Sequence, residues 1–352
     1  MNDSAAPSRL VVRAPNWLGD AIMALPAMAA VRAAFPVSHV AVAAPASIAP
    51  LFDEDTGVAQ DVVVAIAPSD HESRLLGSGG FDTALLLPNS FRSAWTARRA
   101  GIRERWGYAG SGRSPLLTRR VPRPTGRLHQ AEYYAELVRA LGLPVVKSLP
   151  RVVVHAATRH RADELLAACG VASDVARDEV VVGFAPGAAY GHAKRWPPDR
   201  VAQVIRRLAR ERHVVCVLVG AAGDREAGRE IESSLPAGIR AINLIGRTDL
   251  GMLAGVLARC RAFVSNDSGA MHLAAAIGIP VVAIFGPTDE RVTAPLGAHD
   301  VLIHPVFCRP CMLRDCPIDH RCMKGITVDA VAGAVATRLE LGQPSLLPGA
   351  QP

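Results

Sequence analysis

Residues 262–289 hold the pattern that most constrains the fold of this chain: a strand, a tight turn, a helix and a second strand. An apolar run at 262–265 leads into turn and capping residues at 266–269. Residues 270–277 are alanine-rich and favour a helix, and residues 281–285 form an apolar run typical of a strand buried on both faces. The stretch therefore predicts a βαβ unit, and with it a parallel sheet.

The turn inside this unit has the features of an anion site. A helix N-terminus presents unpaired N–H groups and a partial positive charge, so Ser268 and Gly269 can cradle phosphate oxygens. Asp267 follows the carboxyl end of the strand, where open α/β sheets bind ligands, and His272 lies one turn into the helix. The alternative is that Asp267 and Ser268 only cap the helix and His272 is an ordinary helix residue.

Strand and helix patterns alternate through the first part of the chain. Strands are predicted at residues 10–14, 40–43, 61–66, 83–87 and 106–108. Helices are predicted at residues 21–35, 91–100 and 129–141. Residues 111–126 are rich in Gly, Pro, Ser and Arg, which predicts an exposed, mobile loop.

A second alternation follows a helix predicted at 158–169 and ends in the βαβ unit described first. Its strands are expected at residues 180–184, 214–219 and 241–245. Its helices are expected at residues 197–212, 224–235 and 250–260. Two successive alternations predict an α/β protein with two doubly wound, Rossmann-like domains facing a cleft. We expect domains at 1–156 and 157–340, followed by a flexible tail at 341–352.

Bulk properties limit the class of protein. No apolar run reaches the ~18–20 residues of a membrane span, and the short, polar residues 1–8 lack the pattern of a signal peptide. The chain has seven cysteines, an odd number that suits a reducing compartment better than a disulfide framework. We therefore expect a cytoplasmic protein.

Positive charge is concentrated in one segment. Residues 92–127 contain ten arginines and a single acid, Glu104. This indicates an anionic partner: nucleic acid, anionic lipid or a phosphorylated substrate, because the arginine fork suits phosphate and carboxylate. The alternative is a solvated basic face in an arginine-rich protein.

The phosphate-binding motifs of two large classes are missing. There is no GxGxxG after the first strand and no GxxxxGK[ST], which argues against a dinucleotide oxidoreductase and a P-loop NTPase. A second phosphate-friendly loop does occur at 186–196, between a strand and a helix, and Lys194 in it is a suitable point charge. Lys194 alone could be a solvated loop lysine; beside the turn at 266–269 it predicts one half of a diphosphate site.

Several of these motifs together resemble one family. They are residues 13–20 (RAPNWLGD), 87–94 (LPNSFRSA), 186–197 (from PGA to KRWP) and 266–273 (NDSGAMHL), with a cysteine cluster near the carboxyl end. The chain resembles the ADP-heptose:lipopolysaccharide heptosyltransferases, of the two-domain GT-B glycosyltransferase class. Within that family it looks most like the heptosyltransferase II subgroup.

The resemblance implies a reaction. A heptosyl group passes from ADP-L-glycero-D-manno-heptose to heptosyl-Kdo2-lipid A with inversion, in lipopolysaccharide inner-core synthesis. Asp20 is implied as the general base that takes the proton of the acceptor hydroxyl, a role worth ~10²–10⁴-fold. The alternative for Asp20 is the N-cap of the following helix. Lys194 and the helix N-terminus at Ser268 and Gly269 would stabilise the departing ADP.

The resemblance also implies two sets of binding residues. The donor-binding set is Gly187, Ala188, Ala189, Lys194, Asp224, Asp267, Ser268, Gly269 and His272. Some relatives carry hydroxyl residues at the positions of Ala188 and Ala189, so here backbone N–H groups must make those phosphate contacts. Asp224 is expected to hydrogen-bond the ribose. The acceptor-binding set, in the arginine-rich first domain, is Asn16, Arg92, Arg98 and Arg120.

Membrane contact is expected from charge. The acceptor is a glycolipid of the inner membrane, so the protein would lie on the cytoplasmic surface of that membrane as a peripheral protein. The sequence shows no convincing amphipathic anchor, so the arginines would have to supply the attraction. No nucleic acid partner is expected.

No cofactor is expected, and the reaction is predicted to be independent of metal. No Asp-x-Asp pair is placed to hold Mg²⁺, since residues 53–55 read as a surface segment. Cys308, Cys311, Cys316 and Cys322 could hold a structural zinc ion or iron–sulfur cluster, although their spacing does not match paired knuckles. Free thiols or an adventitious disulfide are the alternative. Cysteines 169, 216 and 260 are expected to be packed in or beside core elements.

Three alternatives remain open at this stage. The chain could be a heptosyltransferase I or III that acts on a different core acceptor. It could be an anionic-polymer-binding protein that uses the arginines of 92–127. It could also bind a sugar nucleotide without activity.

Overall fold

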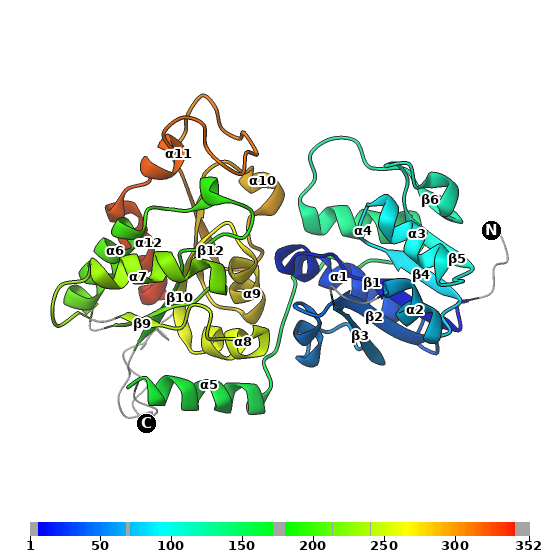
Figure 1. The fold of residues 1–352 in the computed structure, drawn as a ribbon, viewed down its shortest axis with the longest axis horizontal. Helices are drawn as coiled ribbons and strands as arrows, with labels where there is room; N and C mark the ends of the chain where they lie inside the picture. Colours follow the sequence, from blue (N-terminus) through cyan, green and yellow to red (C-terminus); the bar gives the residue numbers. More distant parts are fainter. Residues whose placement is uncertain (1–5, 68–70, 172–179, 213, 240, 342–352) are drawn as a thin grey trace, which may run out of the picture. The chain divides into compact units, whose positions relative to one another are not determined.

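The computed structural model describes residues 6–67, 71–171, 180–212, 214–239 and 241–341. The chain forms two compact units (Figure 1). Unit 1 comprises Met1–Ala156 and Arg291–Leu296, and unit 2 comprises Ala157–Glu290 and Gly297–Pro352. The tail predicted at 341–352 lies, apart from residue 341, outside the described residues.

Unit 1 is built on a six-stranded parallel sheet. Its strands are β1 (Arg9–Arg13), β2 (His39–Pro45), β3 (Val62–Ile66), β4 (Thr83–Leu86), β5 (Glu104–Tyr108) and β6 (Arg119–Val121). They lie in the order β3-β2-β1-β4-β5-β6. The strand order reverses between β1 and β4, which pair in register from Leu10 opposite Thr83 to Arg13 opposite Leu86. Such a switch point opens a crevice at the carboxyl ends of the two strands.

Helices cover both faces of this sheet. They are α1 (Leu18–Ala34), η1 (Ala49–Asp53), α2 (Glu72–Ser78), α3 (Phe91–Arg99), η2 (Ser114–Leu116) and α4 (Gln130–Ala140). Helix α1 packs against α4, and α2 packs against α3. Sequence patterns miss α2, and the prediction of a continuous loop at 111–126 is wrong, because η2 and β6 form within it. Strand β6 is only three residues long, too short to produce a periodic signal.

Unit 2 repeats the architecture. Its strands are β7 (Val181–Ala185), β8 (Val215–Leu218), β9 (Ala241–Asn243), β10 (Cys260–Asn266), β11 (Val281–Phe285) and β12 (His299–Ile303). They form a parallel sheet in the order β12-β11-β10-β7-β8-β9, so the switch point lies between β7 and β10. Every residue of β7 and β11 is buried, as the continuous apolar runs predict for strands covered on both faces.

The helices of unit 2 complete the doubly wound fold. They are α5 (Ala156–Ala168), η3 (His192–Lys194), α6 (Pro198–Arg212), η4 (Ala222–Asp224), α7 (Arg225–Ser233), α8 (Leu250–Ala258), α9 (Gly269–Ile277), α10 (Glu290–Thr293), α11 (Arg321–Lys324) and α12 (Val328–Leu341). Helix α12 packs against α6, whereas α8 packs against α9. Strand β12 and helices α10 to α12 are additions to what the sequence patterns predicted.

The predicted α/β class with two doubly wound domains is confirmed. At each switch point, loops follow the carboxyl ends of two neighbouring strands, which is where doubly wound sheets bind ligands. Each unit therefore has one such position, at β1 and β4 in unit 1 and at β7 and β10 in unit 2. Throughout the part of the chain that the structure describes, no helix combines the length and apolar character needed to cross a bilayer.

Candidate active site

The switch point of unit 2 brings together two of the sequence-predicted loops. The loop at 186–196 follows β7, and the turn at 267–268 follows β10, its neighbour in the sheet. Asn266, the last residue of β10, ties them: its amide donates to the Pro186 carbonyl at 2.7 Å and accepts from the Trp196 N–H at 3.2 Å. Because Asn266 is buried, these bonds fix the loop against the strand.

Lys194 and Asp267 form the charged centre of this site. Lys194 Nζ lies 2.6 Å from Asp267 Oδ2, and the Thr288 hydroxyl donates to the same oxygen at 2.7 Å. The side chains of Lys194 and Asp267 are 12% and 8% exposed. The Lys194 ammonium also lies 4.6 Å from the centre of the Tyr190 ring. The two halves predicted separately from sequence therefore meet in one place.

The start of helix α9 keeps its anion-binding character. Ser268 is the N-cap residue, yet its side chain makes no capping bond; its Oγ lies 3.0 Å from Ser265 Oγ. The carboxylate of Asp267 is turned to Lys194 and Thr288. The alternative in which Asp267 and Ser268 cap the helix with their side chains is therefore wrong. Gly269 begins the helix, and His272 is buried one turn later.

The other predicted donor residues lie around Gly187. Gly187 and Ala188 are buried at the end of β7, and Ala189 is exposed. A Cβ on Gly187 would lie 2.1 Å from Cγ of Asp224, so the backbone and this carboxylate are in direct contact. Asp224 accepts from Arg195 at 3.0 Å and from the Ala221 N–H at 3.2 Å. The structure thus uses the Asp224 oxygens to hold Arg195 and the two loops together.

The cysteine segment packs beside the same loop. The Tyr190 hydroxyl donates to the Met312 carbonyl at 2.8 Å, and the Ala193 N–H donates to the Arg314 carbonyl at 2.9 Å. All seven cysteines are free thiols, with Cys322 buried. Across the described ranges, no three His, Cys, Asp or Glu side chains are arranged as metal ligands. Cys216 and Cys260 are buried as expected, while Cys169 is half-buried.

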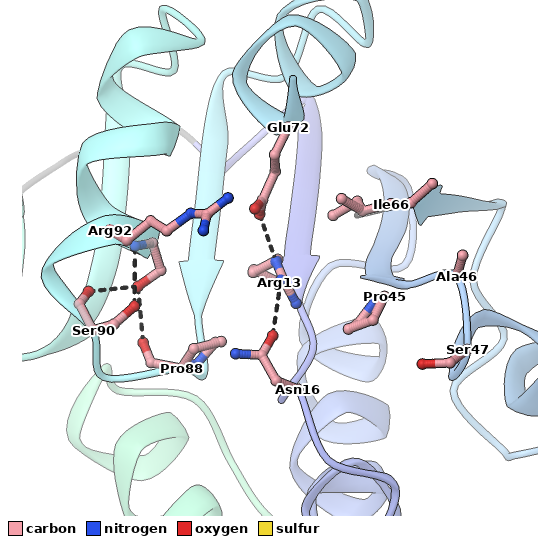
Figure 2. A pocket seen from close by; sticks show the side chains of 12 residues that line it. Arg13, Asn16, Pro45, Ala46, Ser47, Ile66, Glu72, Pro88, Ser90 and Arg92 are labelled. Atoms are coloured by element: carbon pink, nitrogen blue, oxygen red, sulfur yellow. Dashed lines mark hydrogen bonds and ion pairs between the residues drawn. The ribbon is translucent and has the colours of Figure 1, made fainter. Parts of the chain in front are cut away.

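A pocket of about 290 Å³ opens at the switch point of unit 1. It lies at the carboxyl ends of the strands, between the loop after β1 and the start of α3 (Figure 2). Arg13 runs through its centre: its guanidinium donates to Glu72 at 2.6 Å and to Asn16 Oδ1 at 2.9 Å. Arg92 extends toward this group from α3 (Figure 2).

The pocket carries an excess of one positive charge. Its charged lining residues are Arg13, Arg92 and Glu72, and the rest are polar or apolar. Glu72 balances Arg13, whereas Arg92 is exposed and forms no ion pair with any residue that the structure describes. Asn16 and Arg92, two of the predicted acceptor residues, therefore meet here, with Arg13 and Glu72 as additions.

Arg98 and Arg120 lie elsewhere. Neither lines the pocket. Helix α3 starts at the carboxyl end of β4 and runs back along the sheet, so Arg98, in its last turn, lies toward the amino ends of the strands. Arg120 is an exposed residue of the last strand, β6. The structure does not bring these two together with Asn16.

The arginine-rich segment is only partly a surface feature. Arg113 is fully buried and donates to the carbonyls of Tyr108, at 2.8 Å, and Pro88. Burial lowers its pKa to about 10. Arg105 donates to the Leu116 carbonyl at 2.6 Å. Arg105 and Arg113 therefore organise loops, and they are not part of an exposed basic face.

Asp20 occupies the first turn of α1. The N-cap residue is Trp17, so the alternative of Asp20 as N-cap is wrong. The Tyr134 hydroxyl, from α4, forms side-chain hydrogen bonds with Gln130 and Asp20. Burial and then the Asp20 charge raise the pKa of Tyr134. The phenol therefore stays protonated and remains a donor beside the carboxylate.

The acidic residues at 53–55 are not a simple surface segment. Glu54 is buried, and its carboxylate accepts the His155 N–H. Asp53 and Asp55 on either side are exposed. The buried Glu54 carboxylate therefore holds the backbone at His155, near the end of the first segment of unit 1.

Sequence reasoning missed Thr288, Asn266, Glu72 and Tyr134 as site residues. Asn266 stood within a turn already singled out, and its position at a strand's end was the available signal. Glu72 and Tyr134 reach their partners, Arg13 and Asp20, from 59 residues away and from a different helix. No local pattern reports such contacts.

Known proteins share this sequence and fold. Residues 72–321 match the family model of glycosyltransferase family 9 (heptosyltransferase). Lipopolysaccharide heptosyltransferase 2 of Escherichia coli K12 is 34% identical over 299 residues, which cover 82% of this chain and 85% of that protein. Lipooligosaccharide heptosyltransferase 2 of Haemophilus influenzae is 30% identical over 312 residues, covering 84% and 88%.

Structural similarity extends over nearly the whole chain. The structure of E. coli ADP-heptose lps heptosyltransferase II superposes with a TM-score of 0.79 and 29% identity, covering 95% of this chain and 99% of that one. Lipopolysaccharide heptosyltransferase 1 of Pseudomonas aeruginosa matches over 125 residues, 35% of this chain. The resemblance drawn from the sequence motifs is confirmed: this chain belongs to glycosyltransferase family 9, the heptosyltransferases.

Proposed function

We propose that the protein transfers L-glycero-D-manno-heptose from ADP-heptose to heptosyl-Kdo2-lipid A, with inversion at the anomeric carbon. The observation that carries the proposal is the Lys194–Asp267 pair beside the uncapped start of α9. A cation and a helix N-terminus at one switch point suit the diphosphate of a sugar nucleotide. The heptosyltransferase 2 relatives, similar over more than four fifths of the chain, support heptose as the sugar.

The donor site stabilises the leaving group. As the bond between the anomeric carbon and the diphosphate oxygen breaks, negative charge grows on ADP. Lys194 and the N–H groups at Ser268 and Gly269 receive that charge in a largely buried setting, where electrostatic stabilisation is strong. Gly187 and Ala188 approach the phosphates with their backbone, Asp224 positions Arg195, and His272 supports the turn from within α9.

The acceptor side supplies the nucleophile. Asp20 takes the proton of the acceptor hydroxyl while the hydroxyl oxygen forms the new bond to the anomeric carbon. Tyr134 holds the carboxylate through its hydrogen bond. Neither step calls on a cofactor.

The pocket of unit 1 binds the anionic inner sugar of the acceptor. Arg13 ends β1 and Asn16 lies in the loop after it, seven and four residues before Asp20, so the pocket and the base share one short segment. The unpaired Arg92 matches a single carboxylate or phosphate. We propose that the enzyme works at the cytoplasmic surface of the inner membrane, where such an acceptor is anchored.

The test is mass-spectrometric detection of heptose transfer by wild type and Asp20→Asn. The acceptors are heptosyl-Kdo2-lipid A and Kdo2-lipid A, each with ADP-heptose. We expect wild type to act on the first acceptor, and Asp20→Asn to lose ~10²–10⁴-fold while still binding ADP-heptose. Near-full turnover by Asp20→Asn would show that Asp20 is not the general base. A preference for Kdo2-lipid A would show that the enzyme is a heptosyltransferase I.

A further inference from the structure

The outward face of helix α3 combines aromatic rings with arginines. Phe91 and Trp95 are one turn apart, 49% and 44% exposed, with stacked rings whose centroids lie 6.2 Å apart at 17°. The opposite face is buried in unit 1 through Ser93, Ala94, Thr96 and Ala97. Two large aromatic side chains thus remain at the surface although the helix is packed.

The charges on this face have one sign. Arg92, Arg98 and Arg99 are exposed beside the two rings. From residue 88 to residue 103 the chain contains four arginines and no acid. Neither Arg98 nor Arg99 forms an ion pair with any part of the chain that the structure describes. An aromatic and cationic face of this kind complements an anionic lipid headgroup layer.

The face adjoins the acceptor pocket. Arg92 and Ser93, from the first turn of α3, line that pocket. Across the pocket, Asn16 is followed by Trp17, a third exposed aromatic residue at 55%. A glycolipid whose acyl chains stay in a bilayer could therefore present its sugars to the pocket from a membrane that this surface contacts.

We propose that the α3 face, defined as Phe91, Trp95, Arg98 and Arg99, docks the protein on anionic phospholipid. This inference rests on the proposed function only for its biological setting. It supplies the amphipathic anchor that the sequence did not reveal. Its aromatic and cationic residues occupy positions 91, 95, 98 and 99 of a nine-residue helix, a spacing that places them on one face.

Vesicle sedimentation tests the docking directly. Wild type should bind vesicles of phosphatidylethanolamine with phosphatidylglycerol and should not bind phosphatidylcholine vesicles. Arg98→Gln with Arg99→Gln should weaken binding to anionic vesicles by about 30-fold, the effect of two cations at an anionic surface. Phe91→Ser with Trp95→Ser should weaken binding at least tenfold. A charge-matched control is Arg206→Gln with Arg210→Gln, two exposed arginines of α6, which should bind as wild type does.

A second patch of exposed apolar side chains makes the test sharper. Phe307 and Leu313, in the cysteine segment, are 82% and 44% exposed. If Phe307→Ser with Leu313→Ser abolishes vesicle binding and the α3 variants retain it, the proposal is overturned. It is also overturned if wild type binds no vesicle, in which case the α3 face would suit a protein partner instead.

Transfer assays separate this proposal from the enzyme's function. With acceptor embedded in anionic vesicles, the Phe91→Ser, Trp95→Ser protein should be at least tenfold slower than wild type. With a deacylated, water-soluble acceptor the two should be equal, which also shows that the variant is folded. An equal loss on both acceptors would contradict docking by α3. Absence of transfer by wild type on either acceptor would refute the function, and the sedimentation result would stand by itself.

Discussion

Lys194 Nζ and Asp267 Oδ2 are 2.6 Å apart at the switch point of unit 2, although 73 residues separate them in the sequence. Asp267 holds the Lys194 side chain in place, and Thr288 donates a hydrogen bond to the same carboxylate oxygen. The pair therefore links the stability of the site to its proposed chemistry.

A double-mutant cycle separates these two roles. Lys194→Met should lower turnover ~10²–10³-fold by removing a charge that stabilises the leaving diphosphate. It should also lower the free energy of unfolding by about 1–3 kcal/mol, because the buried Asp267 loses its cation. Adding Asp267→Asn should restore most of the stability but not the turnover, as measured by denaturant unfolding and heptose transfer. Recovery of turnover in the double variant would show that Lys194 acts only on the fold.

Tyr134→Phe should disturb the base without touching the substrates. Loss of a hydrogen bond to a charged group, worth about 1.5–3 kcal/mol, corresponds to roughly tenfold to hundredfold slower transfer. The acidic limb of the pH–rate profile should move to higher pH, because a donor that favours the charged carboxylate is gone.

Tyr108→Phe is the matched control for that experiment. It also removes a buried hydroxyl, one that donates to the Tyr133 carbonyl at 2.7 Å. Its pH–rate profile should follow that of wild type. If both variants shift the profile alike, the effect comes from the packing of α4 and not from Asp20.

Arg113→Lys should loosen the pocket of unit 1, the proposed acceptor site. A lysine cannot replace the guanidinium fork that donates to the Tyr108 and Pro88 carbonyls. Each buried carbonyl left without a donor costs about 1–3 kcal/mol, so the midpoint of thermal unfolding should fall. The KM for the acceptor should rise, since Pro88 lines the pocket, while the KM for ADP-heptose stays the same. Arg99→Lys, at an exposed position, should leave the unfolding midpoint unchanged.

The cysteines should separate into two reactivity classes. Burial raises the pKa of Cys216 and of Cys260 to about 12, and it also raises the pKa of Cys322. The thiolate is the reactive form, so these three should resist iodoacetamide at pH 8, while the half-buried Cys169, Cys308, Cys311 and Cys316 react first. Mass spectrometry of tryptic peptides measures the order, and rapid labelling of Cys260 in the folded protein would contradict it.

Cys216 and Cys260 contribute a pH dependence of stability. In the unfolded chain they lose protons near pH 9.0, but in the folded protein only near pH 12. Their contribution is therefore complete below pH 9 and is lost as pH rises toward 12. Urea unfolding at pH 8 and above pH 10 should show the decrease in Cm.

Sequence patterns predicted the two sheets because strands buried on both faces, such as Val281–Phe285, give continuous apolar runs. They also predicted that Lys194 and Asp267 belong to one site, since parallel strands place their carboxyl ends at one edge, but they did not predict the ion pair between the two side chains. They could not predict that Arg113 is buried, because its acceptors at Pro88 and Tyr108 come from loops whose approach depends on the whole sheet. Sequence patterns also could not predict the role of Glu72, because its contact with Arg13 depends on where the seven-residue helix α2 lies in the fold.

The contact between Gly187 and Asp224 sets a rule for redesign of the proposed nucleotide site. Even a methyl group at position 187 would overlap the carboxylate, so an alanine there would expel Asp224 and release Arg195 from its tether. Libraries that aim at a different nucleotide should therefore keep this glycine and the carboxylate as a unit and diversify Arg195 or the exposed Ala189. The freedom to evolve new donor preference lies in the side chains around that contact, while the contact itself tolerates no added atom.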